Sequence, residues 1–156
     1  MKRISKKQGL NLRSSRGFTI VEILVVIAII AILAAIVFVS LNPAKRFQDA
    51  NNAQRLANVN AILNAIGQNI VDNKGKFTKD TSCDTEVAKI ASSAKAIGTD
   101  TVNLQLCLTD YLAKLPFDPK GGTAADTGYE IKTSSSGGYT ISAPDAEGGA
   151  VIEVTR

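Results

Sequence analysis

The feature that most constrains this chain is an apolar run near its N-terminus, from Gly17 to Leu41. Between Ile23 and Val39 the run contains no polar side chain. As a helix, residues 18–41 would be about 36 Å long, which is enough to cross a hydrocarbon core of about 30 Å. A helix is the expected structure because it satisfies its own backbone hydrogen bonds, as a segment in lipid must. The run therefore predicts a membrane-spanning helix at residues 18–41.

One residue, Glu22, breaks the apolar pattern near its start. A lone carboxylate in an apolar segment is costly and usually has a partner or a function. The alternative is that Glu22 forms the polar edge of an ordinary signal anchor. The residues alone leave both interpretations open.

Positive charge is concentrated before the apolar run. Residues 1–17 hold six of the 18 basic residues and no acidic one, so the rest of the chain has 12 basic and 14 acidic residues. The basic isoelectric point therefore does not indicate nucleic-acid binding. Positive residues before an apolar helix hold that end in the cytoplasm, so the remainder is expected to face outward. The six residues are Lys2, Arg3, Lys6, Lys7, Arg13 and Arg16.

An ordinary secretory signal is the alternative to a retained helix. Such a signal would be cut after its apolar region, at a small-residue site such as Ala34-Ala35. These alanines lie inside a run that is longer than a typical secretory h-region. The length of the run therefore favours a helix that stays in the mature chain.

The residues around the start of the run form a specific motif, Arg16-Gly17-Phe18-Thr19-Ile20-Val21-Glu22. This motif, followed by the apolar run, resembles the class III signal sequence of type IV pilins and pseudopilins. The resemblance implies that a prepilin peptidase removes the leader 1–17 by cleaving between Gly17 and Phe18, and then methylates Phe18. It also implies that Glu22 pairs with the N-terminal amine of a neighbouring subunit during assembly.

A second helix is expected directly after the membrane span. Asn42-Pro43 should end or kink the first helix, because proline removes an N–H and disfavours α conformation at the preceding residue; the resemblance gives Pro43 the same role of helix breaker. Residues 42–74 are then an amphipathic continuation, so that one helix of about 55 residues runs from Phe18 to Lys74, with Gly75 as its C-cap. The apolar stripe consists of Leu56, Val59, Leu63, Ile66 and Ile70.

The stripe needs a partner, and two heptads are too few to predict a coiled coil. Packing on a sheet of the same chain is favoured. The remaining residues, 75–156, are expected to form a globular head with a connector and three short strands, at residues 128–133, 139–142 and 151–154, in which alternating apolar and polar residues flank turn residues. The predicted fold class is α+β, a long N-terminal helix packed against a small antiparallel sheet.

The connector, residues 76–115, predicts one or two short helices. Residues 86–97 have helical composition, with Ser82 or Thr85 as a possible cap and Gly98 at the end. A second apolar piece spans residues 104–115 and is broken by Pro116.

Two cysteines, Cys83 and Cys107, lie in this expected exported region. Their spacing does not fit a CxxC zinc motif. A single disulfide is favoured because the compartment is oxidising. Two buried free thiols are the alternative, since Cys107 lies among leucines.

Residue types that carry catalysis are scarce. The chain has no histidine, which excludes a histidine-based triad, metal ligand or general base. Some pseudopilins bind calcium in the region of the C-terminal loops, where Asp118, Asp126 and Asp145 lie here, but the spacing of these residues matches no calcium loop and favours solvated turn carboxylates. We therefore expect no enzyme, no metal and no cofactor.

Three classes of function remain. The resemblance implies a structural subunit of a type IV pilus-like filament, which sits in the inner membrane until an assembly platform adds it to an extracellular homo-oligomer. A pseudopilin of a type II secretion or DNA-uptake machine is the first alternative. A membrane-anchored binding or enzyme domain is the second, and the lack of a nucleophile motif, phosphate loop or metal cluster argues against it.

Overall fold

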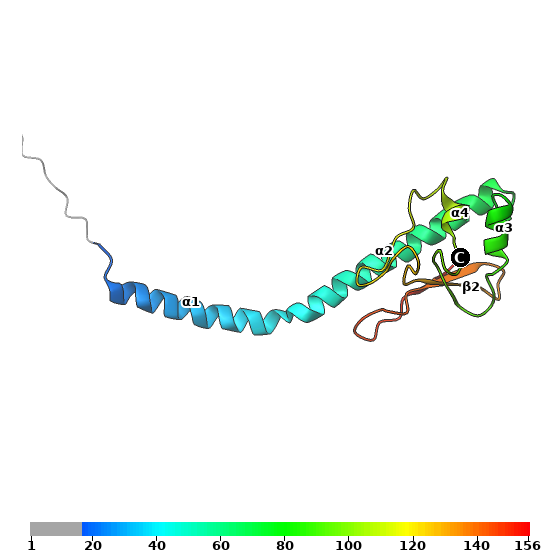
Figure 1. The fold of residues 1–156 in the computed structure, drawn as a ribbon. Coiled ribbons are helices and arrows are strands. Elements are labelled where there is room, and N and C mark those ends of the chain that lie inside the picture. Colours follow the sequence, from blue (N-terminus) through cyan, green and yellow to red (C-terminus); the bar gives the residue numbers. More distant parts are fainter. Residues whose placement is uncertain (1–16) are drawn as a thin grey trace, which may run out of the picture. The chain divides into compact units, whose positions relative to one another are not determined.

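The computed structural model describes residues 17–156, so the expected leader up to Arg16 lies outside the described residues. The chain divides into two compact units between Asn42 and Pro43. The first contains α1 (Ile20–Leu41), and the second is a head that contains α2 and the rest of the chain (Figure 1). The elements of the head are α2 (Pro43–Asp72), α3 (Thr81–Val87), β1 (Lys95–Ala96), α4 (Gln105–Leu108), β2 (Glu130–Thr133), β3 (Tyr139–Ser142) and β4 (Glu153–Thr155).

The long N-terminal helical segment is confirmed, but it is divided at Asn42. This residue has a left-handed backbone, with φ 37° and ψ 74°, and it closes α1 as its C-cap. Pro43 follows as the first residue of α2. Proline disfavours α conformation in the residue before it, and asparagine tolerates the left-handed region better than most residues. The break lies at the predicted position, and the expected helical stretch from Phe18 to Lys74 consists of two helices, α1 and α2, that meet there.

The core of the head lies between α2 and the sheet. From the predicted stripe, Val59, Leu63 and Ile66 are buried, whereas Leu56 is 46% exposed. They pack in one cluster with apolar residues of the sheet and connector, as predicted from the helical spacing. The other large members of this cluster include Ile62, Ile97, Leu104, Leu108, Tyr129, Ile131 and Ile141.

The antiparallel sheet is confirmed, with four strands instead of three. Their order is β1-β2-β3-β4, and each neighbouring pair is antiparallel. The hairpin of β2 and β3 has Ile131 opposite Ile141, and both side chains are buried. β4 begins two residues later and ends one residue later than the predicted strand 151–154.

The strand β1 was not predicted from the sequence. Residues 86–97 were expected to be helical, but α3 begins earlier, where the Asp80 side chain accepts a hydrogen bond from the Cys83 backbone N–H at 2.9 Å, and it ends at Val87. Lys95 and Ala96 instead pair with β2. A two-residue edge strand has no alternation of its own, so only its partner defines it.

Candidate functional site

The predicted cleavage point lies just before α1. Gly17 and Phe18 precede the helix and are exposed, Phe18 by 81% of its surface. A Cβ placed on Gly17 would meet no atom of the described chain within 4 Å. No other part of the described chain therefore covers these two residues.

Thr19 and Glu22 form a capping box at the start of α1. The Glu22 carboxylate accepts hydrogen bonds from the Thr19 backbone N–H at 2.8 Å and from the Thr19 hydroxyl at 2.9 Å. In return, the Glu22 backbone N–H donates to the Thr19 hydroxyl oxygen at 3.2 Å. This reciprocal arrangement satisfies donors that would otherwise be unpaired at a helix start. It also holds the charged carboxylate within four residues of Phe18.

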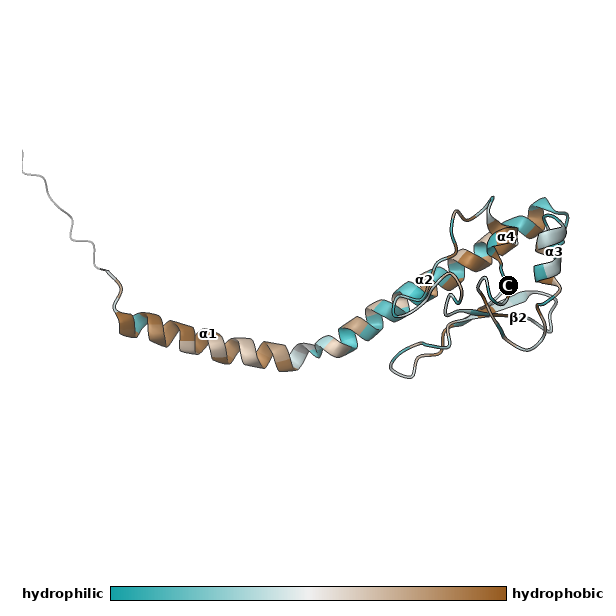
Figure 2. Ribbon diagram, viewed as in Figure 1, coloured by the Kyte–Doolittle hydropathy of each residue, from teal (hydrophilic) through white to brown (hydrophobic). Residues whose placement is uncertain are grey.

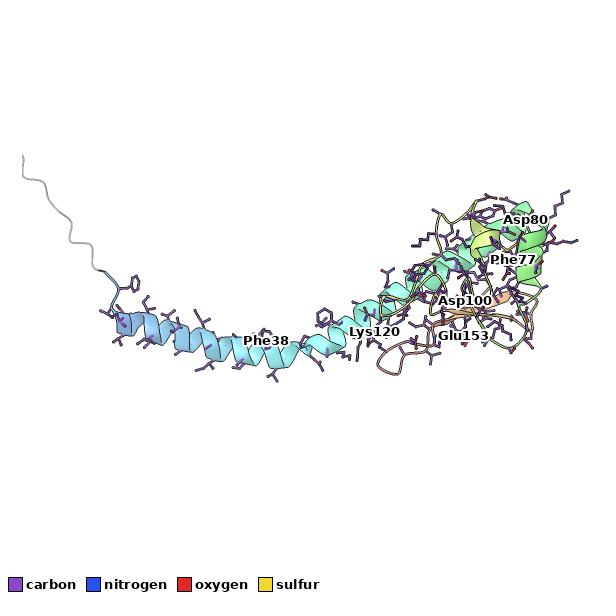
Figure 3. The ribbon with its side chains drawn as sticks, in the orientation of Figure 1. Phe38, Phe77, Asp80, Asp100, Lys120 and Glu153 are labelled. Carbon is purple, nitrogen blue, oxygen red and sulfur yellow. A yellow bond between two sulfur atoms is a disulfide. The ribbon has the colours of Figure 1, made fainter. Side chains whose placement is uncertain are left out.

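The rest of α1 consists mostly of apolar residues. Residues 20–40 have high mean hydropathy, and none of them is buried within the chain. Figure 2 shows apolar residues along most of α1, and Figure 3 shows its side chains, Phe38 among them, pointing outward around the helix. α1 is long and apolar enough to cross a membrane. Its side chains find no apolar partner within the described chain.

Comparison with family models gives one match, to the prokaryotic N-terminal methylation motif, over residues 12–38. The matched segment contains the predicted cleavage point, Glu22 and most of the apolar helix. The chain carries a type IV pilin-like signal sequence. Neither the curated proteins nor the solved structures gave a match. The N-terminal segment of the chain is therefore pilin- or pseudopilin-like.

The cysteines of this pilin-like chain lie together in the head. Cys83 in α3 and Cys107 in α4 are joined by a disulfide, with Cα atoms 4.9 Å apart. Both are buried, and the structure has the bridge instead of two free thiols. The bridge joins the two short helices of the connector, each of which has too few residues to be stable alone.

Removing this bridge should weaken the head. Because the two cysteines are 24 positions apart, the chain-entropy model gives a loss of about 3.5 kcal/mol in the free energy of unfolding. We expect Cys83→Ala with Cys107→Ala to lower the unfolding midpoint and to expose residues 76–115 to protease before α2. Denaturant unfolding and limited proteolysis measure both effects. Alkylation of both cysteines in the exported chain without reductant would contradict this prediction.

A buried polar cluster ties α2 to two loops of the head. The Arg55 guanidinium is fully buried and bonds to the Asp118 carboxylate at two points, Nε to Oδ2 at 2.6 Å and Nη2 to Oδ1 at 3.0 Å. Its Nη1 also lies 3.2 Å from Glu147 Oε2. A two-point pairing fixes both the charge and the plane of the guanidinium. The pair therefore sets where the loop that contains Asp118 meets α2.

Glu147, in the loop between β3 and β4, receives further partners. Its carboxylate accepts hydrogen bonds from the Asn51 side chain at 2.8 Å and from the Lys120 ammonium at 2.7 Å. Its backbone N–H and C=O bond to the side chain of Asn52, at 3.0 Å and 2.8 Å. These bonds fasten the loop to the first half of α2.

The cluster keeps its carboxyls ionised. Burial raises the pKa of Asp118, but hydrogen bonds from Arg55 and from the Lys120 backbone N–H outweigh it and hold the pKa below its usual value. Hydrogen bonds from Lys120 and Asn51, and then from Arg55, lower the pKa of Glu147 from 4.5 to about 2. The hydrogen bonds to Asp118, followed by those to Glu147, raise the pKa of Arg55 despite its burial.

The buried polar cluster makes the stability of the head sensitive to acid. The folded pKa of Glu147 lies below its usual value, so its ionised form stabilises the head above pH 4.5, and that contribution is lost as the pH falls towards about 2. We expect the midpoint of denaturant unfolding to fall across this window. In Glu147→Gln the fall should be smaller, because that group no longer titrates. An equal fall in both proteins would contradict the prediction.

The burial of Arg55 was not predicted from the sequence. The sequence does contain an indication of it, because Arg55 is four residues before Val59 and seven before Ile62, which places a charged side chain on the apolar face of the helix. Asn58 and Asn69, which are not part of the predicted apolar stripe, are also buried. The Asn58 amide donates to the Tyr129 hydroxyl at 2.8 Å, and the Asn69 amide donates to the Cys107 carbonyl at 3.2 Å.

The three acidic residues weighed for calcium do not act together. Asp118 is a partner of Arg55 and is 6% exposed, so the expectation that it is a solvated turn carboxylate is wrong. The Asp126 carboxylate accepts a hydrogen bond from the Gly128 backbone N–H at 2.9 Å, which is a turn contact. Among residues 17–156, no three acidic or cysteine side chains gather in a way that could hold a metal ion.

Proposed function

We propose that this chain is a structural subunit of a type IV pilus-like filament. The observation that carries the proposal is that α1 is exposed from Ile20 to Ser40 although the head has a core of its own. Because exposed apolar helices are stable only in lipid or against other apolar surfaces, α1 requires first a membrane and then other copies of itself. The methylation motif at its start supports the same route.

The proposed route has three steps. The chain is inserted in the inner membrane with its leader in the cytoplasm, and prepilin peptidase cleaves between Gly17 and Phe18 and methylates Phe18. An inner-membrane assembly platform then adds the subunit to an extracellular homo-oligomer that packs through α1. We infer a structural and not a catalytic role, without cofactor or metal, since the chain has no histidine for acid–base chemistry.

Processing can be tested directly. Intact-mass and N-terminal analysis of the mature protein should show a chain that begins with methylated Phe18. Gly17→Ala should still be processed, whereas Gly17→Leu should leave precursor in the membrane, because a bulky side chain at the open Gly17 position obstructs the peptidase. A mature chain that begins within residues 34–40 would instead indicate an ordinary secretory signal.

The material sheared from cells distinguishes a pilus from the alternative machine. Long fibres composed of this chain, seen by electron microscopy, are expected for a pilus subunit. If the processed chain stays in the cell envelope and its deletion stops protein export or DNA uptake without loss of fibres, the chain is a pseudopilin.

A further inference from the structure

The first turns of α2 carry an exposed aromatic side chain that nothing in the head requires. Phe47 is 72% exposed, although most aromatic side chains of the head lie in or against its core. Pro43, Phe47 and Ala50 recur at steps of four and three, so they lie along one side of α2. This side is an apolar strip at the very start of the head.

Two basic residues lie next to Phe47 in the sequence. Lys45 and Arg46 directly precede Phe47, both are exposed, and the first turn of α2 has no acidic residue. Arg46 makes no ion pair within residues 17–156. After the leader is removed, these two are the first basic side chains that follow the apolar span. The processed chain therefore has basic side chains at the outer end of its span and none on the inner side.

The chain holds this group close to the membrane. The apolar span ends at Ser40, and Phe47 follows seven residues later, which corresponds to a helical rise of about 10 Å. An interfacial layer of headgroups adds about 5–8 Å to each side of the hydrocarbon core. Long basic side chains reach phosphates from such a position, and aromatic rings are enriched at this level.

We propose that Lys45, Arg46 and Phe47, which project from different sides of the first turns of α2, contact the anionic outer surface of the membrane and hold the processed subunit at a fixed depth before assembly. The proposal rests on the membrane placement of α1 in the proposed function. The two cations match the charge of lipid phosphates, and Phe47 supplies the apolar contact. A fixed depth keeps Glu22 and Phe18 at the same level in every waiting subunit.

The chain has no tryptophan, so a single substitution introduces a unique fluorescent reporter. The whole chain with Phe47→Trp would be placed in vesicles of phosphatidylcholine, alone or mixed with phosphatidylglycerol, with brominated lipids as quenchers. Phe38→Trp, inside the span, reports insertion. Val71→Trp is the matched control, because this side chain is 77% exposed on the same helix but about 36 Å farther along.

We expect the Phe47→Trp reporter to be quenched by brominated lipid, more strongly with phosphatidylglycerol, and Val71→Trp to remain unquenched. Adding Lys45→Gln and Arg46→Gln should remove the effect of phosphatidylglycerol. We expect each substitution to lower the ratio of membrane-bound to unbound reporter by about fivefold. The proposal is overturned if the Phe47→Trp reporter is unquenched while Phe38→Trp is quenched. It is also overturned if its emission shifts with protein concentration but ignores brominated lipid, which would assign Phe47 to a contact between copies. Neither outcome depends on whether filaments form.

Discussion

Asp118→Asn should lower the free energy of unfolding of the head by about 3–5 kcal/mol, because it leaves the buried Arg55 guanidinium without the carboxylate that binds it at two points. Small domains are stable by only about 5–15 kcal/mol, so much of the variant should be unfolded or degraded in cells. Urea unfolding of the whole chain in detergent micelles, followed by circular dichroism, measures the loss.

Two further variants separate charge from packing. Asp110→Asn is the matched control, since Asp110 is 63% exposed and pairs with Lys79 at the surface, where the loss should be about 1 kcal/mol or less. Arg55→Met with Asp118→Leu should recover most of the stability, because apolar residues of similar size remove both buried charges. If Asp118→Asn unfolds at the same urea concentration as the unaltered chain, the buried pair does not stabilise the head.

Glu22→Gln should be cleaved, inserted and folded normally, yet it should enter filaments poorly. Two unit charges about 4 Å apart attract by roughly 4 kcal/mol at an effective dielectric constant of 20, before the cost of desolvation is subtracted. Within the described chain the Glu22 carboxylate bonds only to Thr19, which carries no charge. We expect the amine of a neighbour's Phe18 to supply the missing positive charge in a packed filament and to select the axial register of the incoming subunit.

The measurement is the yield of sheared filaments from a strain that lacks the unaltered subunit. Glu22→Gln keeps the shape of the side chain and removes its charge, whereas Glu22→Ala removes both. Glu153→Gln is the control, because this carboxyl is on β4 in the head and partly exposed. Normal assembly of Glu22→Gln would show that Glu22 is only the polar edge of the span.

Predictions from the sequence succeeded where a feature is local. The strand at 139–142 matches β3 at both ends, because its alternating residues lie between clear turns. The apolar stripe of α2 was predicted from its spacing alone, and Val59, Leu63 and Ile66 are buried. Predictions failed where a partner decides the structure: Lys95 and Ala96 resemble part of a helix until β2 pairs with them.

By itself, the sequence determined the apolar helix, the motif before it and the position of the break at Asn42-Pro43. Each of these follows from neighbouring residues, through hydropathy, the capping box that Thr19 and Glu22 form at the start of α1, and the restricted backbone of proline. Only the tertiary structure decided that Arg55 is buried, because its stability there depends on a carboxylate 63 positions away at Asp118. A charge on an apolar face is unfavourable until its partner is in place, and no local pattern specifies which loop will supply that partner.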